Sequence, residues 1–341
     1  MIARSNIFLI GNGFDLAHGL ETSYKDFIKN ICNKLKLDQN CLPELIRPRY
    51  GLEFNNEGII DPKCFENTYH DKCAGNIVFM KIIEEMHQNN NWCDIEQLYY
   101  NILRNSPSNY IKILNNDFEQ IKKKLEEYIS YKYKQKQVEL IDSFIVLFQS
   151  FHLEYKLLIN FNYTSLPELY LDKETAMIFN IHGQINEESN PIIFGYAPNS
   201  KTIDELLSKN EDEYVRNIKS TSYSRNNNVT LLEKFLSEHT YSQYNVFILG
   251  HSCGISDEYI LQKILGNKGV ANIIPVYFKD MVHYKEQFNN IARIIGGEET
   301  RNKIIPFDIC PEMIQKDSTI ELITKNKKRI MALCEDISWK E

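Results

Sequence analysis

Short apolar runs separated by helical patterns make up most of the chain. The first run, Ile7–Ile10, is too short for a helix and predicts one buried strand. Further runs of this kind predict strands at Lys156–Tyr163, Ala176–Gly183, Pro191–Tyr196, Tyr244–Ser252 and Ala271–Phe278. Near-continuous apolar strands are buried on both faces, as in a parallel sheet covered by helices. The pattern therefore predicts an α/β fold with a mostly parallel sheet.

Helical spacing dominates the segments between these runs. Ser23 and Asp26 resemble a capping box at the start of a helix that continues to Leu35. Helical spacing returns at Asn76–Gln88, Trp92–Asn105, Asn109–Gln137, Val138–Phe151 and Ser318–Trp339. We expect one α/β domain made of residues 1–38 and 151–341, with a mostly helical insertion at 39–150 and a smaller helical insertion at 201–240.

The most regular helical pattern alternates apolar steps of three and four. Its members are Ile111, Leu114, Phe118, Ile121, Leu125 and Tyr128, and we call them the seam. The seam spans about two and a half heptads, fewer than the three or four that are typical of a coiled coil. We expect a helix packed within its own chain, with Val138–Phe151 as its partner. The alternative is an interface with a second copy or with a helix of another chain.

The composition limits which binding partners and which cellular compartment are expected. The 341 residues include 39 basic and 46 acidic ones, which gives no electrostatic footprint for nucleic acid. The first apolar stretch spans four residues, too few for a signal peptide, and no run approaches a membrane span. The eight cysteines form no CxxC pair, so we expect free thiols and no metal site. The composition predicts a cytoplasmic protein without membrane or nucleic-acid partners.

Small polar clusters follow four of the predicted strands. They are Gly11-Asn12-Gly13-Phe14-Asp15, Asn160-Phe161-Asn162-Tyr163-Thr164, His182-Gly183 and Gly250-His251-Ser252. The ligand crevice of open α/β sheets lies at the carboxyl ends of the strands, so we expect the clusters to converge on one site. The first cluster lacks the third glycine of the dinucleotide fingerprint, and the absence of a Walker lysine disfavours P-loop phosphoryl transfer.

Each cluster also has a purely structural interpretation. Gly11 and Gly13 would form a tight turn, in a left-handed conformation where the turn needs one. Asn162 would cap the turn after its strand, and His182 would be a packed histidine bonded to a backbone carbonyl. Asp257 would favour the N-terminus of the helix that follows it. The residues alone leave these alternatives open.

The motifs resemble a known family. LIGNGFDLAHGL, followed by TSYKDF, NFNYT, HG and GHS, resembles the bacteriophage abortive-infection AbiH family over most of the chain, least in the insertions. More distantly, the order of the clusters is similar to the sirtuin-like NAD-binding fold, which implies a Rossmann-like sheet. Asn162 falls where sirtuin-like NAD hydrolases carry a catalytic asparagine, and His182 and Gly183 resemble their histidine–glycine pair.

Some sirtuin features are missing from this chain. The Gly-Ile-Pro-x-Phe-Arg segment and the four-cysteine zinc module are absent from the sequence, so protein deacylation is not expected. Thr164 stands where sirtuins carry an aspartate two residues after the asparagine. The resemblance is therefore limited to the part of the sirtuin site that binds NAD.

The resemblance implies an antiphage effector that binds NAD and hydrolyses its nicotinamide–ribose bond, restrained until an unknown phage trigger acts. Asn162 would hold a ribose hydroxyl or a water, and His182 would take the proton. Asp15 would face a ribose hydroxyl or the nicotinamide, or cap the turn. The glycine-loop amides and the helix start would hold the pyrophosphate. The expected NAD-binding residues are Gly11, Asn12, Gly13, Phe14, Thr164, Gly250, Ser252 and Asp257.

Two other functions compete with NAD hydrolysis. A nuclease toxin is one, but its nearest acidic pair, Asp94 and Glu96, is two residues apart on a predicted helix and does not share a face. A non-catalytic sensor of NAD or ADP-ribose is the other, because a fold alone does not fix a function. Turnover of NAD separates the hydrolase from both.

Overall fold

The computed structural model describes residues 4–34, 76–88, 94–149, 155–172, 175–198, 200–208, 211–224, 226–239 and 243–338. The irregular stretch of the predicted insertion, residues 39–75, lies outside the described residues. The chain divides into two compact units. The sheet unit comprises Met1–Thr22, Ile129–Ile193 and Ser222–Glu341, and the helical unit comprises Ser23–Tyr128 and Phe194–Thr221.

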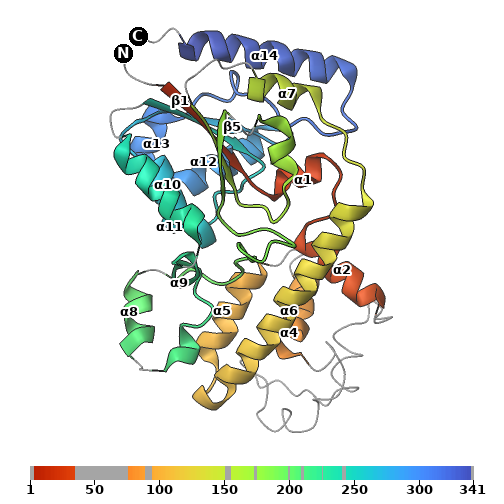
Figure 1. The fold of residues 1–341 in the computed structure, drawn as a ribbon, viewed down its shortest axis with the longest axis vertical. Helices are drawn as coiled ribbons and strands as arrows, with labels where there is room; N and C mark the ends of the chain where they lie inside the picture. The colour runs from red at the N-terminus through yellow and green to blue at the C-terminus, as the bar shows by residue number, and fades with distance from the viewer. Residues whose placement is uncertain are drawn as a thin grey trace. The chain divides into compact units, whose positions relative to one another are not determined.

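The sheet has five parallel strands in the order β3-β2-β1-β4-β5 (Figure 1). The strands are β1 (Arg4–Ile10), β2 (Tyr155–Asn160), β3 (Ala176–Asn180), β4 (Gln243–Leu249) and β5 (Val270–Val276). This order is that of the first five strands of a doubly wound α/β fold. The predicted α/β, Rossmann-like fold with a mostly parallel sheet is thus confirmed.

The predicted strand at Pro191–Tyr196 is wrong, because its backbone groups have other partners. The amide of Ile193 donates to the carbonyl of His182 at 2.7 Å. The amide of Gly195 donates to the Glu96 carboxylate at 2.9 Å, and Tyr196 forms only an isolated bridge with Ile218. Apolar character alone could not distinguish this buried, extended segment from a sheet strand.

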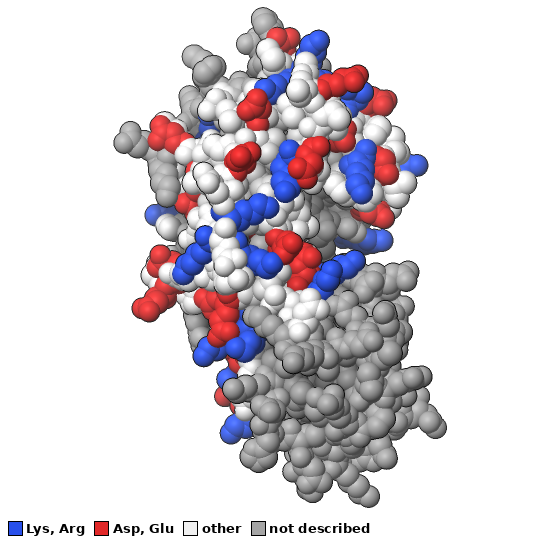
Figure 2. Space-filling view, turned by 90° about the vertical axis from the view of Figure 1, so that its right-hand side faces the viewer, with Lys and Arg blue, Asp and Glu red and all other residues white. Residues whose placement is uncertain are grey.

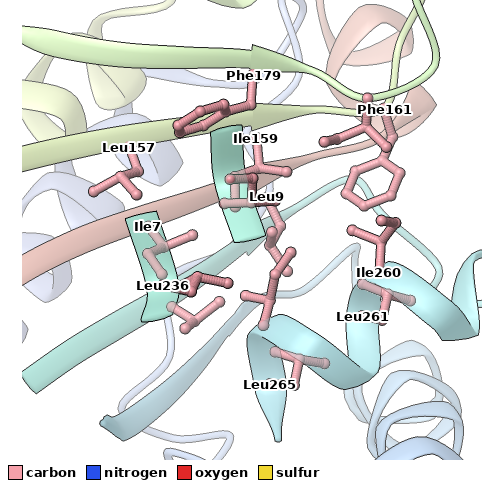
Figure 3. Close-up of a cluster of buried hydrophobic side chains, with 14 of the residues drawn as sticks. Ile7, Leu9, Leu157, Ile159, Phe161, Phe179, Leu236, Ile260, Leu261 and Leu265 are labelled. Atoms are coloured by element: carbon pink, nitrogen blue, oxygen red, sulfur yellow. The ribbon is translucent and has the colours of Figure 1, made fainter. Parts of the chain in front are cut away.

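Alternate side chains of the strands point to opposite faces, and both faces are buried. Ile7 and Leu9 of β1 join the core formed with α10 (Asn227–Glu238) and α11 (Glu258–Leu265), where Figure 3 shows them with Leu236 and Leu261. Phe8 and Ile10 join the opposite core, formed with α1 (Asn12–Ala17), α7 (Asp142–Gln149) and α14 (Ile320–Ser338). Burial on both faces explains why the strands read as continuous apolar runs. The remaining helices of this unit include α12 (Met281–Ile295) and α13 (Gly297–Lys303).

The helical unit contains the long helix α6 (Ser108–Gln135), which continues into the sheet unit from Ile129. With it are α2 (Tyr24–Lys34), α4 (Ile77–Gln88), α5 (Ile95–Asn105), α8 (Ser200–Ser208) and most of α9 (Lys219–Tyr223). Ser23 accepts a hydrogen bond from the Asp26 amide at 3.1 Å, which confirms that it caps α2.

All six side chains of the seam are buried in the single chain, which confirms internal packing. Their partner was predicted wrongly. The Phe118 ring stacks on Tyr99 of α5, with ring centroids 3.9 Å apart, and on Phe194. Residues of α7 pack against the sheet instead, because that helix is apolar enough to fill the second core. Association with a second copy through another surface stays a prediction.

Two further expectations bear on the described residues. None of their helices combines the length and apolar character needed to cross a membrane. Cys253 and Cys310 are buried free thiols, as expected.

Candidate functional site

Two loops meet at the carboxyl ends of β1 and β4, where the strand order reverses. The amide of Gly11 donates to Leu249 at 3.0 Å, and that of Gly13 donates to Gly250 at 2.9 Å. A Cβ on Gly13 would lie 2.7 Å from the Gly250 Cα, closer than side chains approach backbone. Gly250 has a positive φ of +66°, whereas Gly11 and Gly13 do not have left-handed conformations. The first loop therefore needs glycine for close contact with the second.

This contact changes the expected role of the glycine loop. The Gly11 and Gly13 amides, predicted to hold a pyrophosphate, already donate to carbonyls of β4 and its loop. Asn12 is exposed and accepts a hydrogen bond from Thr22 at 2.7 Å. Phe14 is fully buried among core aromatic rings, 5.0 Å from Phe144 between centroids, so its side chain belongs to the core.

Asp15, in the first turn of α1, ties this helix to the loop after β2. It is buried, and its carboxylate accepts from Asn162 Nδ2 at 2.9 Å and from Thr164 Oγ1 at 2.9 and 3.0 Å. Burial disfavours the charged form and raises the pKa of Asp15 to about 7, although these hydrogen bonds oppose the shift. Because Nδ2 of Asn162 faces Asp15, its Oδ1 is the atom left to accept from a ligand.

Asp257 lies between two histidines that the sequence places 69 positions apart. Its Oδ1 is 3.0 Å from Nε2 of His182, and its Oδ2 is 3.5 Å from Nε2 of His251. Nδ1 of His182 is 3.1 Å from the Phe161 carbonyl, and Nδ1 of His251 accepts from the Cys253 amide at 3.0 Å. Asp257 occupies the N-cap position of α11, yet its side chain makes no capping hydrogen bond. The cap predicted as one alternative is thus not formed by this side chain.

A cavity of about 310 Å³ opens beside the two loops, at the carboxyl ends of β4 and β5. Gly13, Gly250, His251 and Ser252 line one side, and α12 lines another. Gln287 of α12 donates to the His251 carbonyl at 3.0 Å, and Asn290 donates to that of Ser252 at 2.8 Å. The remaining walls are largely apolar, from Leu16, Val276, Phe278 and Met313. Cavities of this size and character hold small molecules.

The structure brings some of the predicted site residues together. Gly13, Gly250 and Ser252 line the cavity. Asn162 and Thr164 converge on Asp15, and His182 converges on Asp257. His251 belongs to a cluster that the sequence placed at the site, but no role was predicted for its side chain, although a second histidine directly after a strand was a usable clue. The polar residues of α12 gave no clue, because they lie on an ordinary amphipathic helix.

A metal centre finds no support in the part of the chain that the structure describes, where no group of three or more His, Cys, Asp or Glu side chains could hold a metal ion. The acidic pair of the nuclease hypothesis has structural partners instead. Asp94 caps α5, and Glu96 forms a buried ion pair with Lys219 at 2.8 Å.

Comparison with known proteins adds one match. The family model described as bacteriophage abortive infection AbiH matches residues 7–278, a span that contains both loops, Asn162, His182 and Asp257. No curated protein matches the chain.

Proposed function

The chain belongs to the bacteriophage abortive-infection AbiH family, and we propose that it serves phage defence by binding NAD and hydrolysing its nicotinamide–ribose bond. The observation that carries this proposal is that polar groups from several strand ends contact one another at the carboxyl edge of the sheet, where residues after β1 and β4 also line a cavity. Binding at the carboxyl edge, where strand order reverses, is the usual mode of doubly wound sheets.

The cavity suits the adenosine half of a dinucleotide. Its apolar walls match the faces of a planar base, and Ser252 and Glu286 at its edge offer polar groups to ribose hydroxyls. The nicotinamide half would extend toward Asn162 and the pair formed by His182 and Asp257. The pyrophosphate would then be held by groups other than the Gly11 and Gly13 amides, which are already bonded.

The reaction needs few groups. The bond between ribose C1′ and the pyridinium nitrogen breaks, and its electron pair leaves with neutral nicotinamide. Positive charge develops on the ribose, a water oxygen bonds to C1′, and one water proton is released to an acceptor. In this proposal Oδ1 of Asn162 accepts from a ribose hydroxyl or from the water, and Asp15 positions that amide rather than touching the substrate.

The test is NAD turnover by the purified chain, with and without phage components, followed by chromatography of nicotinamide and ADP-ribose. Asn162→Ala and His182→Ala should lower the rate at least a hundredfold, roughly the loss typical for positioned polar groups in active sites. Asn101→Ala, an exposed asparagine of α5, is the matched control and should be neutral. Unchanged NAD consumption in a folded Asn162 or His182 variant contradicts the mechanism.

A non-catalytic sensor is the second candidate, and one observation favours it. Both ring nitrogens of His182 face protein oxygens, which suits a histidine that holds structure rather than moves protons. A sensor would bind NAD or ADP-ribose without consuming either. A nuclease has weaker support: on the face that Figure 2 shows, basic and acidic side chains of the described residues are interspersed rather than gathered into a basic groove.

A further inference from the structure

We propose that Asp257 is the carboxylate that faces the nicotinamide ribose, and that His182 and His251 are positioning residues that hold it ionised. This inference rests on the proposed binding of NAD. It changes the chemical role expected for His182, from a proton acceptor to a charged group that fixes its neighbour.

The hydrogen-bond geometry around His182 supports a ring that is protonated on both nitrogens. Its Nδ1 faces the Phe161 carbonyl, which only accepts, so Nδ1 carries a proton. Its Nε2 faces the Asp257 carboxylate at 3.0 Å. Without a proton, the lone pair of Nε2 would point at a lone pair of the carboxylate oxygen, and the two would repel each other. The Tyr223 hydroxyl also lies near this Nε2, but farther away, at 3.4 Å. In this proposal, His182 and Asp257 form an imidazolium–carboxylate pair.

His18 in the same unit is a useful contrast. Its Nδ1 also faces a carbonyl, that of Phe14, at 2.7 Å. Its Nε2, however, faces the Tyr170 hydroxyl, which can donate, and the ring stays neutral. At Nε2, a carboxylate is the nearer partner of His182, with the Tyr223 hydroxyl farther away, whereas a hydroxyl is the partner of His18.

His251 holds the other oxygen of Asp257. Its Nδ1 accepts from the Cys253 amide, so Nε2 carries the ring proton and points it toward Asp257 Oδ2. Cys253 has a φ of +54°, in the left-handed region that residues other than glycine rarely adopt. This unfavourable backbone conformation places the Cys253 amide where it donates to Nδ1 of His251. Strained backbone of this kind gathers at functional sites.

His251 lines the cavity, and Asp257 beside it has the largest exposed fraction of the three side chains. Its side chain is 11% exposed, against 8% for His182 and 5% for His251. It leaves the helix N-terminus beside it uncapped, so local helix stability does not explain its orientation. Two rings therefore hold a partly accessible carboxylate at the carboxyl edge of the sheet.

Such a carboxylate suits the proposed reaction. The ribose becomes positively charged as nicotinamide leaves, and a fixed negative charge beside it lowers the energy of that state. The water that adds to C1′ becomes strongly acidic as the new bond forms, so even a carboxylate can accept its proton. No proton needs to move to His182 in this scheme.

The experiment compares binding of NAD⁺ and NADH by titration calorimetry, because only NAD⁺ carries a positive charge on the ring attached to this ribose. The wild type should prefer NAD⁺, and Asp257→Asn should reduce that preference by about tenfold, equivalent to about 1.4 kcal/mol. Asp257→Glu keeps the charge and should keep the preference. Asp204→Asn, which removes an exposed carboxylate from α8, is the matched control.

Turnover supplies a second readout. Asp257→Asn should lower kcat by about a hundred- to a thousandfold, because the charge acts most strongly on the transition state, and should raise KM by up to about tenfold, in line with the weaker binding of NAD⁺. His251→Asn should lower kcat less and keep part of the NAD⁺ preference. If Asp257→Asn does not fold, the His251→Asn variant tests the same role of Asp257.

The outcomes separate the two proposals. An unchanged preference for NAD⁺ in Asp257→Asn overturns the role of Asp257, even if the wild type hydrolyses NAD. Binding with an Asp257-dependent preference, but without turnover, supports Asp257 and overturns hydrolysis. Failure of the wild type to bind either nucleotide overturns both.

Discussion

Two buried groups, Asp15 of α1 and His18 directly after that helix, should make opposite contributions to stability as the pH falls. His18 is buried, and burial lowers its pKa from 6.5 to about 4. Asp15, three positions earlier, is also buried, and burial raises its pKa from 3.8 to about 7. Between pH 8 and pH 5 the unfolded chain gains a proton at His18, while the folded chain gains one at Asp15.

The magnitudes follow from one proton each. Below its unfolded pKa of 6.5, His18 loses stabilisation at about 1.36 kcal/mol per pH unit, or about 2 kcal/mol at pH 5. Asp15 behaves in the opposite sense, because its folded pKa is the higher one. Below pH 7 it adds stabilisation at the same rate, about 2.7 kcal/mol by pH 5. The wild type should hide both effects through their near cancellation.

Single variants separate them. The free energy of unfolding is measured by urea denaturation with circular dichroism at several values between pH 8 and pH 5. The wild-type value minus that of His18→Phe should fall by about 2 kcal/mol over this range, and the difference from Asp15→Asn should rise by about 2.7 kcal/mol. The contributions of titratable groups that the wild type and the variant share cancel in these differences. A flat difference for either variant, or one of opposite sign, refutes the assignment for that group.

Three other variants test the packing. Gly13→Val should cost about 1–3 kcal/mol of unfolding free energy and weaken NAD binding, because its Cβ meets backbone at 2.7 Å; wild-type stability and affinity would contradict this. Leu114→Glu with Leu125→Glu should abolish helix content by circular dichroism, because both positions are buried, whereas a folded chain of altered mass in light scattering would favour an oligomer seam. Lys219→Met should lower the free energy of unfolding by about 3–5 kcal/mol, because it removes the cation that pairs with the buried Glu96 carboxylate; an unchanged denaturation midpoint would show that the pair is not important.

Local pattern was sufficient for the elements of the fold. Strands buried on both faces, such as β1 and β4, show as continuous apolar runs, and the strict spacing of the seam predicted α6. These patterns reflect the period of a strand or helix and the burial of one or two faces, which neighbouring residues encode directly. The same rule misassigned Pro191–Tyr196, because its backbone partners are a distant loop and the Glu96 carboxylate.

The site was only partly readable from the chain. Polar residues directly after strands identified the carboxyl edge, and the parallel sheet required those ends to converge. The sequence could not show that position 13 needs glycine because its backbone packs against Gly250, since that contact joins positions 237 residues apart. The sequence also could not reveal that Asp15 orients Asn162. Each of these short polar side chains can form hydrogen bonds with several groups near it in the chain, and the pattern does not show which partner it takes.

The arrangement around Asp257 was decided by tertiary structure alone. In the sequence it is an acid at the start of a helix, where capping is the ordinary role. In the folded chain, β3 and β4 bring His182 and His251 to its two carboxylate oxygens, and the cap is not formed. Periodicity encodes which residues are buried, whereas the partner of a buried polar group depends on strand order and loop conformation, which act between distant segments.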